Sequence, residues 1–258
     1  MEVDRAHLAG DARLDDSGCV VLSHSNFSSV RATCCVFDGA WEYEVTIGTS
    51  GIMQLGWATF RCPFTHEHGV GDAQDSYAYD GHRVKKWNVT SQPYGHAWVS
   101  GDVISVRIDL RRGQQKGGGS VSYSRNGIDL GTAFDDVRRF APGLAYFPAV
   151  SLSVGERCAL NFGDAPLRYP TPGFRPLQDA PSVAVVAAVT RGLGAFERAV
   201  ASSWPREAAA AAAGGAGKSK SKSSSTASDA TDRSAVVAEE VLLAAASLRR
   251  AGPHLASP

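Results

Sequence analysis

Two segments of the chain alternate strictly between apolar and polar residues. The first runs from Trp41 to Ile47, with Glu42, Glu44 and Thr46 between its apolar residues, and the second runs from Ile104 to Leu110. A period of two places alternate side chains on opposite faces of a strand. Both segments are therefore expected to be half-buried antiparallel strands, with the glutamates on the wet face.

A hairpin is predicted further along the chain. The apolar-polar stretches Val121–Arg125 and Ile128–Leu130 flank Asn126 and Gly127, two residue types that tolerate the positive φ of a two-residue turn. Further strands are expected at Cys19–Leu22, Thr33–Phe37, Ile52–Ala58, Phe147–Leu152 and Cys158–Phe162. Turns rich in Gly, Asp and Pro connect these segments, and no helical pattern lies between them. The prediction is an all-β fold, an antiparallel two-sheet β-sandwich.

The hydrophobic pattern changes near Pro181, so the sandwich domain is expected to span residues 1–180. Apolar residues at three- and four-residue spacing predict an amphipathic helix over 181–206. Residues 207–234 are rich in Ala, Gly, Lys and Ser and predict a disordered linker. A short helix and tail are predicted over 235–258. This helical, low-complexity extension has no apolar partner in the chain, so a longer protein is expected.

Charge and cysteine usage narrow the class of protein. Lys plus Arg equals Asp plus Glu at 26 each, so no overall field favours nucleic acid or a membrane surface. No apolar run of signal-peptide or membrane-spanning length is present. The five cysteines are odd in number and include the adjacent Cys34 and Cys35, which favours reduced, buried thiols. A cytoplasmic or nuclear location is expected.

Three kinds of catalytic or ligand site have weak support. Cys62, His66 and His68 lack a fourth metal ligand. No Gly-x-Ser-x-Gly nucleophile motif is present, and the glycine-rich stretch 113–119 lacks the Gly-Lys-Ser/Thr of a phosphate-binding loop. We therefore expect no metal, no cofactor and no catalytic residues.

The segment from Phe64 to Trp98 interleaves aromatic and basic residues. Aromatic side chains and arginine dominate protein interfaces because they bury a large area at small entropic cost. Tyr77 and Trp98 are expected in the core. Beside the turn at Asp80 and Gly81, both packing and partner contact remain open for Tyr79, Arg83, Lys85 and Trp87.

Short motifs occur in a recognisable order along two thirds of the chain. They are Trp41–Val45, Gly56–Thr59, Ser76–Gly81, Gly101–Ile104, Ser124–Gly127, Leu130–Phe134, Tyr146–Val150 and Asn161–Gly163. This order resembles the SPRY domain. The stretches Gly69–Asp72, Arg83–Thr90, Pro166–Pro170 and Arg175–Asp179 are similar to the SPRY domain of a narrower family, the large RING-type ligase subunit of the Kip ubiquitylation-promoting complex and its plant relatives.

The resemblance implies positions for partner contact. Peptide-capturing SPRY domains use the loop before the second strand, the residue after the Gly-Trp-Ala-Thr strand and the loop before the final strand. Here these positions are Ser23–Phe27, including Asn26, then Thr59, and the loop containing Ser153 and Val154. The arginine and tryptophan of some peptide-binding members are not matched, which puts the same ligand class in doubt.

The resemblance also implies a function without catalysis in this chain. A RING needs about eight Cys and His ligands in paired spacings, whereas this chain has five scattered cysteines and no Cys-x-x-Cys. We expect a module that recruits a protein or peptide substrate or partner for a RING-type E3 ubiquitin ligase. The alternatives are a SPRY adaptor in a chromatin or RNA-processing assembly, and an enzyme domain with an unrecognised active site. The oligomeric state is not predicted.

Overall fold

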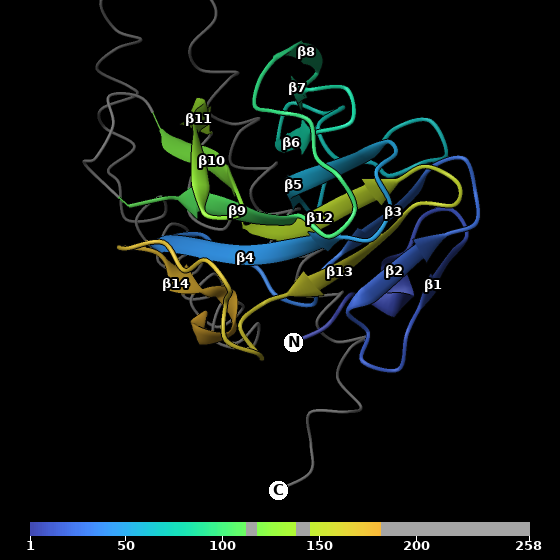
Figure 1. Cartoon of the computed structure of the whole chain (residues 1–258), viewed down its shortest axis with the longest axis horizontal. Coiled ribbons are helices and arrows are strands. Elements are labelled where there is room, and N and C mark those ends of the chain that lie inside the picture. Colours follow the sequence, from blue (N-terminus) through green and yellow to red (C-terminus); the bar gives the residue numbers. More distant parts are fainter. Residues whose placement is uncertain (112–117, 138–144, 182–258) are drawn as a thin grey trace, which may run out of the picture. The chain divides into compact units, whose positions relative to one another are not determined.

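The computed structural model describes residues 1–111, 118–137 and 145–181, which form two antiparallel β-sheets (Figure 1). The helices and linker expected after residue 181 lie outside the described residues. The strands are β1 (Ala12–Leu14), β2 (Val20–Ser23), β3 (Ser28–Arg31), β4 (Ala40–Ile47), β5 (Met53–Thr59), β6 (Ser76–Asp80), β7 (Lys85–Asn88), β8 (Thr90–Pro93), β9 (Val103–Asp109), β10 (Gly119–Arg125), β11 (Ile128–Val137), β12 (Tyr146–Leu152), β13 (Arg157–Asn161) and β14 (Arg175–Pro176). Two short 3-10 helices, η1 (Arg5–His7) and η2 (Leu177–Asp179), accompany them.

The first sheet has the order β1-β2-β13-β4-β9-β10-β11, and β14 adds a short parallel pairing to β4. The second sheet has the order β3-β12-β5-β6-β7-β8. Because sequential strands repeatedly cross between the sheets, the fold is a β-sandwich, as the alternation of apolar residues predicts.

Large aromatic side chains fill the space between the sheets. Tyr43 of β4 is fully buried, and its hydroxyl donates to the Gly56 carbonyl of the opposite sheet at 2.6 Å. Tyr123 of β10 donates to the Leu55 carbonyl at 3.1 Å. The ring of Trp57 meets Tyr43 edge-on at 5.3 Å. These phenols bury a large apolar area while their polar ends remain hydrogen-bonded, so they tie the two sheets together.

The predicted hairpin is confirmed. Asn126 and Gly127 connect β10 to β11 with φ values of 51° and 78°. Positive φ at both positions is the type I′ geometry, which matches the twist of the flanking strands.

One predicted strand is wrong. Within Thr33–Phe37 the backbone makes only an isolated bridge between Val36 and Tyr146. The strand lies just before it, at β3, where all four residues from Ser28 to Arg31 are buried. Serine and arginine conceal this strand from a search for apolar alternation, because hydrogen bonds rather than apolar contacts satisfy its outward side chains.

The prediction that Glu42 and Glu44 face water is also wrong. Both are buried, at 1% and 2% exposure, beneath residues 164–179, which we call the C-terminal strap. Glu44 accepts hydrogen bonds from the backbone N–H groups of Arg168 and Tyr169 at 2.8 and 2.7 Å, and Glu42 accepts one from Thr171 at 2.8 Å. The strap thus supplies backbone donors to both carboxylates, while the second Glu42 oxygen, Oε2, is buried without a hydrogen-bond partner among the described residues.

The cysteines fit the expectation of reduced thiols. Cys34, Cys35, Cys62 and Cys158 are buried and Cys19 is half-buried, and all five are free. Burial raises the pKa of Cys62 to about 11 and that of Cys35 to about 12, so these thiols stay protonated and unreactive. Among the described residues, no helix is long and apolar enough to cross a membrane.

Candidate partner-binding surface

Six connections meet at one end of the sandwich, because successive antiparallel strands return the chain to the same end. We call this surface the loop end, and it comprises residues 24–27, 48–52, 81–84, 94–102, 126–127 and 153–156. All six connections lie within the described residues, and rigid strands fix both ends of each connection. Such loops on a rigid sandwich are the usual place for recognition.

Hydrogen bonds tie several of these loops to one another. Glu156 accepts hydrogen bonds from the Thr49 hydroxyl at 2.5 Å and from the Gly51 N–H at 2.8 Å. The Gly155 N–H donates to the Ser23 carbonyl at 2.9 Å. These bonds hold neighbouring loops in one arrangement, which lowers the conformational entropy that a partner's binding would cost.

The structure brings the first and last of the expected contact loops together at this end. Ser28 of β3 pairs with Leu152 of β12, so the loop with Asn26 lies beside the loop with Ser153 and Val154. Asn26 is exposed, Ser153 is half-buried and Val154 is 59% exposed. These side chains are accessible on a common edge.

Thr59 does not belong to this surface. In the pairing of β5 with β12, Met53 lies opposite Leu152 and Thr59 lies opposite Tyr146, so Thr59 is at the far end of the strand. Six residues of extended chain separate the two ends by about 20 Å. Thr59 is also buried, and its hydroxyl donates to Asp75. The expectation that Thr59 contacts a partner together with the other two loops is therefore wrong.

Tyr79 and Asp80 have no exposed surface, so neither side chain can touch a partner in this arrangement. Tyr79 packs edge-on against Tyr94 at 5.4 Å and donates its hydroxyl to the His96 carbonyl. Burial raises the pKa of Tyr79 to about 12. The expectation that Tyr77 and Trp98 are core residues is confirmed by their exposures of 2% and 3%.

Lys85 and Trp87, expected beside the turn at Asp80 and Gly81, lie on strand β7. Trp87 pairs with Ala78 and packs on the outer face of the second sheet against a small cluster that includes Cys62 and Val70. Arg83 lies in the β6–β7 turn and stacks on the Trp87 ring at 4.3 Å. The loop end thus continues onto this part of the outer face.

Two exposed apolar residues, one in the loop end and one directly beside it, were not identified from the sequence. Val99 is 60% exposed in the β8–β9 connection, and Ile128 is 67% exposed directly after the β10–β11 turn. Each immediately neighbours a turn residue, where an apolar side chain cannot reach the core. An apolar residue directly beside a turn residue is therefore the sequence signal that could have identified them as exposed.

The candidate metal ligands do not come together. Cys62 is buried, whereas His66 and His68 are exposed in the β5–β6 connection. Within the part of the chain that the structure describes, no group of three His, Cys, Asp or Glu residues has the geometry to hold a metal ion.

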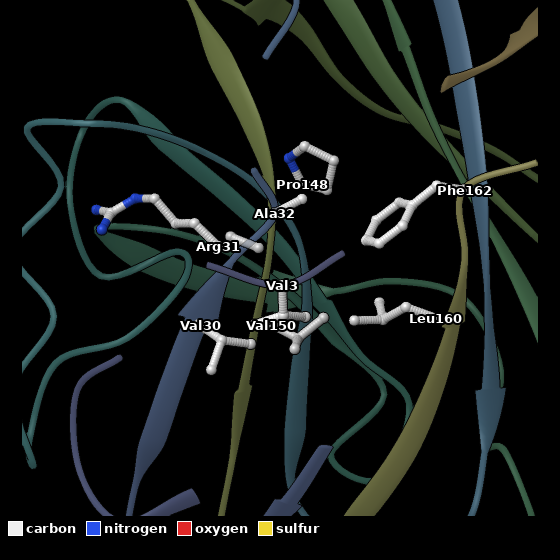
Figure 2. Close-up of a pocket in the computed structure, with 9 residues that line it drawn as sticks. Val3, Val30, Arg31, Ala32, Pro148, Val150, Leu160 and Phe162 are labelled. Carbon is white, nitrogen blue, oxygen red and sulfur yellow. The ribbon is translucent and has the colours of Figure 1, made fainter. Parts of the chain in front are cut away.

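A small apolar gap lies beneath the N-terminal segment (Figure 2). Val3, Val30, Val150, Leu160 and Phe162 line it, and the space between them leaves no room for a water molecule. This gap is a packing irregularity of the core and offers no small-molecule site.

Comparison with known proteins identifies the family. The SPRY domain family model matches residues 40–165. The E3 ubiquitin-protein ligase RKP of Arabidopsis thaliana is 53% identical over 175 residues, which cover 68% of this chain and 13% of that ligase. The crystal structure of the SPRY domain of human HERC1 is similar in fold, with a TM-score of 0.50 at 15% identity over 62% of this chain and 96% of that one. Residues 40–165 of the chain are therefore a SPRY domain.

Proposed function

We propose that this chain is a non-catalytic module that recruits a protein substrate or partner to a RING-type E3 ubiquitin ligase inside the cell, in the cytoplasm or nucleus. The observation that carries the proposal is the loop end. Its connections are tied together, and they expose Asn26, Val99, Ile128 and Val154 on one side of a rigid sandwich.

The exposed residues have the chemistry of a protein-binding surface. Val99, Ile128 and Val154 are at least 59% exposed, and each would lose contact with water on binding. Exposed polar groups such as Asn26 and Ser50 surround them and can orient a partner by hydrogen bonds. Exposed apolar side chains among polar groups suit a peptide or protein partner, whereas a small molecule needs a concave pocket.

The link to ubiquitin transfer rests on the similarity to RKP, whose name describes an E3 ubiquitin-protein ligase. The aligned region covers only 13% of that ligase. A part for this chain in ubiquitin transfer is therefore our proposal. The reduced cysteines support an intracellular location.

A pair of matched valine variants tests the proposal. Val154→Asp places a charge on the loop end, and Val89→Asp places the same charge on the β7–β8 turn at the other end, where Val89 is 54% exposed. Proximity labelling in cells with the full chain as bait should lose a defined set of proteins with Val154→Asp and retain it with Val89→Asp. Members of that set should also carry less ubiquitin in cells that express the ligase with Val154→Asp.

If both variants label the same proteins as the unmodified chain, recruitment does not use the loop end. If the set is lost but its ubiquitin content is unchanged, the module binds partners for a purpose other than ubiquitin transfer. Thermal melts of both variants establish that the fold is intact, since neither valine is buried.

A further inference from the structure

The β6–β7 turn holds an arginine in a fixed position above a buried carboxylate. Asp80 has no exposed surface and accepts the backbone N–H groups of His82 and Arg83 at 2.9 and 3.0 Å. Its second oxygen accepts the Nε–H of Arg83. Asp80 therefore secures both the turn and the inner edge of the guanidinium group.

The indole ring of Trp87 supports the same guanidinium group from one side. The Arg83 carbon Cζ lies 4.3 Å from the ring centroid, a stacking distance for a cation over an aromatic face. Arg83 remains 32% exposed. Nε is bound to Asp80 and one face lies on the indole ring, and no described residue accepts a hydrogen bond from the two terminal nitrogens, which can therefore bind a ligand.

The residue after Arg83 has an unusual backbone conformation. Val84 has φ of 55°, a left-handed conformation that a β-branched residue rarely adopts. The Tyr94 N–H donates to the Val84 carbonyl at 3.1 Å and secures this conformation. Strained positions that the surroundings stabilise are concentrated at ligand-binding sites.

A second cation faces the same indole ring. The Lys85 Nζ lies 6.0 Å from the Trp87 centroid, and no described carboxylate forms an ion pair with it. Asp102, another acidic residue of the loop end, already forms an ion pair with Arg125 at 3.9 Å. Asp80 balances the charge of Arg83, so the net positive charge of the corner formed by Arg83, Lys85 and Trp87 comes from Lys85.

We propose that this corner, which we call the Arg83 corner, binds the carboxylate side chain of an acidic segment in the protein partner. Arg83 offers a paired set of N–H donors, Lys85 adds a nearby positive charge, and Trp87 provides an apolar surface for the methylene groups of a glutamate. This inference rests on the proposed function, because it names the chemistry of the partner that the loop end and its adjoining face would capture.

Nuclear magnetic resonance of the full chain tests the proposal with two synthetic peptides, one containing four glutamates and the other glutamines at the same positions. The resonances to follow are the Arg83 Nε–H and the Trp87 indole N–H, which has no acceptor among the described residues. The glutamate peptide should shift both in a saturable way, with a Kd at least about tenfold below that of the glutamine peptide. Raising the salt concentration should weaken this binding.

Three charge-removing variants separate the site from overall charge. Arg83→Gln should weaken binding about tenfold, and Lys85→Gln should weaken it by a smaller factor without disturbing Asp80. Arg13→Gln removes the same charge from an exposed arginine on β1 and should have no effect. Equal binding of the two peptides, or equal effects of Arg83→Gln and Arg13→Gln, would overturn the proposal.

A third peptide with phosphoserine in place of one glutamate distinguishes the source of the anion. Binding of that peptide alone would overturn the carboxylate assignment in favour of a phosphorylated partner. If no peptide shifts the Arg83 and Trp87 resonances while Val154→Asp still abolishes recruitment in cells, the Arg83 corner is not used and the proposed function stands. If Val154→Asp has no effect but the glutamate peptide binds at Arg83, the proposed function fails and the anion site remains.

Discussion

Replacing Glu44 by glutamine tests whether buried carboxylates hold the C-terminal strap on the first sheet. The Glu44 side chain is 2% exposed and accepts two backbone N–H groups, from Arg168 and Tyr169. Glutamine keeps one acceptor oxygen, and its amide nitrogen would face the second N–H donor. One partly buried N–H group therefore loses its acceptor, and the other exchanges a charged acceptor for a neutral one.

The expected loss follows from these two changes. A hydrogen bond to a charged group contributes about 1.5–3 kcal/mol, and an unsatisfied buried donor costs about 1–3 kcal/mol. Because removal of the negative charge also lowers the cost of burial, the net decrease in the free energy of unfolding should be about 2 kcal/mol. For a domain of this size such a change lowers the melting temperature by about 4–8 °C.

Urea unfolding of both proteins measures this quantity, with Glu67→Gln as a control because Glu67 is exposed and its side chain contacts little. The control should change the free energy of unfolding by less than about 0.5 kcal/mol. Trypsin should also cleave at Arg168 faster in Glu44→Gln, since the strap is released more often. Equal midpoints and equal cleavage for Glu44→Gln and the unmodified chain would show that the carboxylate does not hold the strap.

Three further predictions concern the same fold. Burial raises the pKa of Glu42, so the folded protein keeps the Glu42 proton to a higher pH than the unfolded chain does. As pH rises from the pKa of the unfolded chain through that of the folded protein, the unmodified protein should lose stability relative to Glu42→Gln. A difference in the free energy of unfolding that does not change with pH would contradict the raised pKa. Trp41→Ala should lower the free energy of unfolding by about 3–5 kcal/mol in the same urea assay, because Trp41 is 1% exposed. Limited proteolysis should leave a stable core that ends near Asp179, and rapid cleavage inside β4 would contradict the domain boundary.

Local patterns predicted most of the strands for physical reasons. Alternating residues located β4 and β9, because one face of each strand packs in the core. Asn126 and Gly127 located the hairpin, because few other residues adopt left-handed conformations without strain. The burial of Glu42 and Glu44 was missed because the strap that covers them lies more than a hundred residues away in sequence.

The candidate site was only partly predictable. The loops of Asn26 and Val154 lie together because β3 and β12 are neighbours, as the resemblance to SPRY domains implies. Thr59 was misplaced because an antiparallel strand of seven residues carries its two ends to opposite sides of the sandwich. Arg83 stacks on Trp87 in a turn where Val84 has a left-handed backbone. Because β-branched residues rarely adopt this conformation, the sequence does not predict the turn.

Site-specific photo-crosslinking in cells tests the central claim, recruitment through the loop end, most directly. A photoreactive amino acid at position 26 or 154 should form covalent adducts with the same partner protein, because the two loops lie side by side. The same amino acid at position 89, on the other end of the sandwich, should form no adduct with that partner. Adducts with the partner at position 89 and none at positions 26 and 154 would contradict the claim.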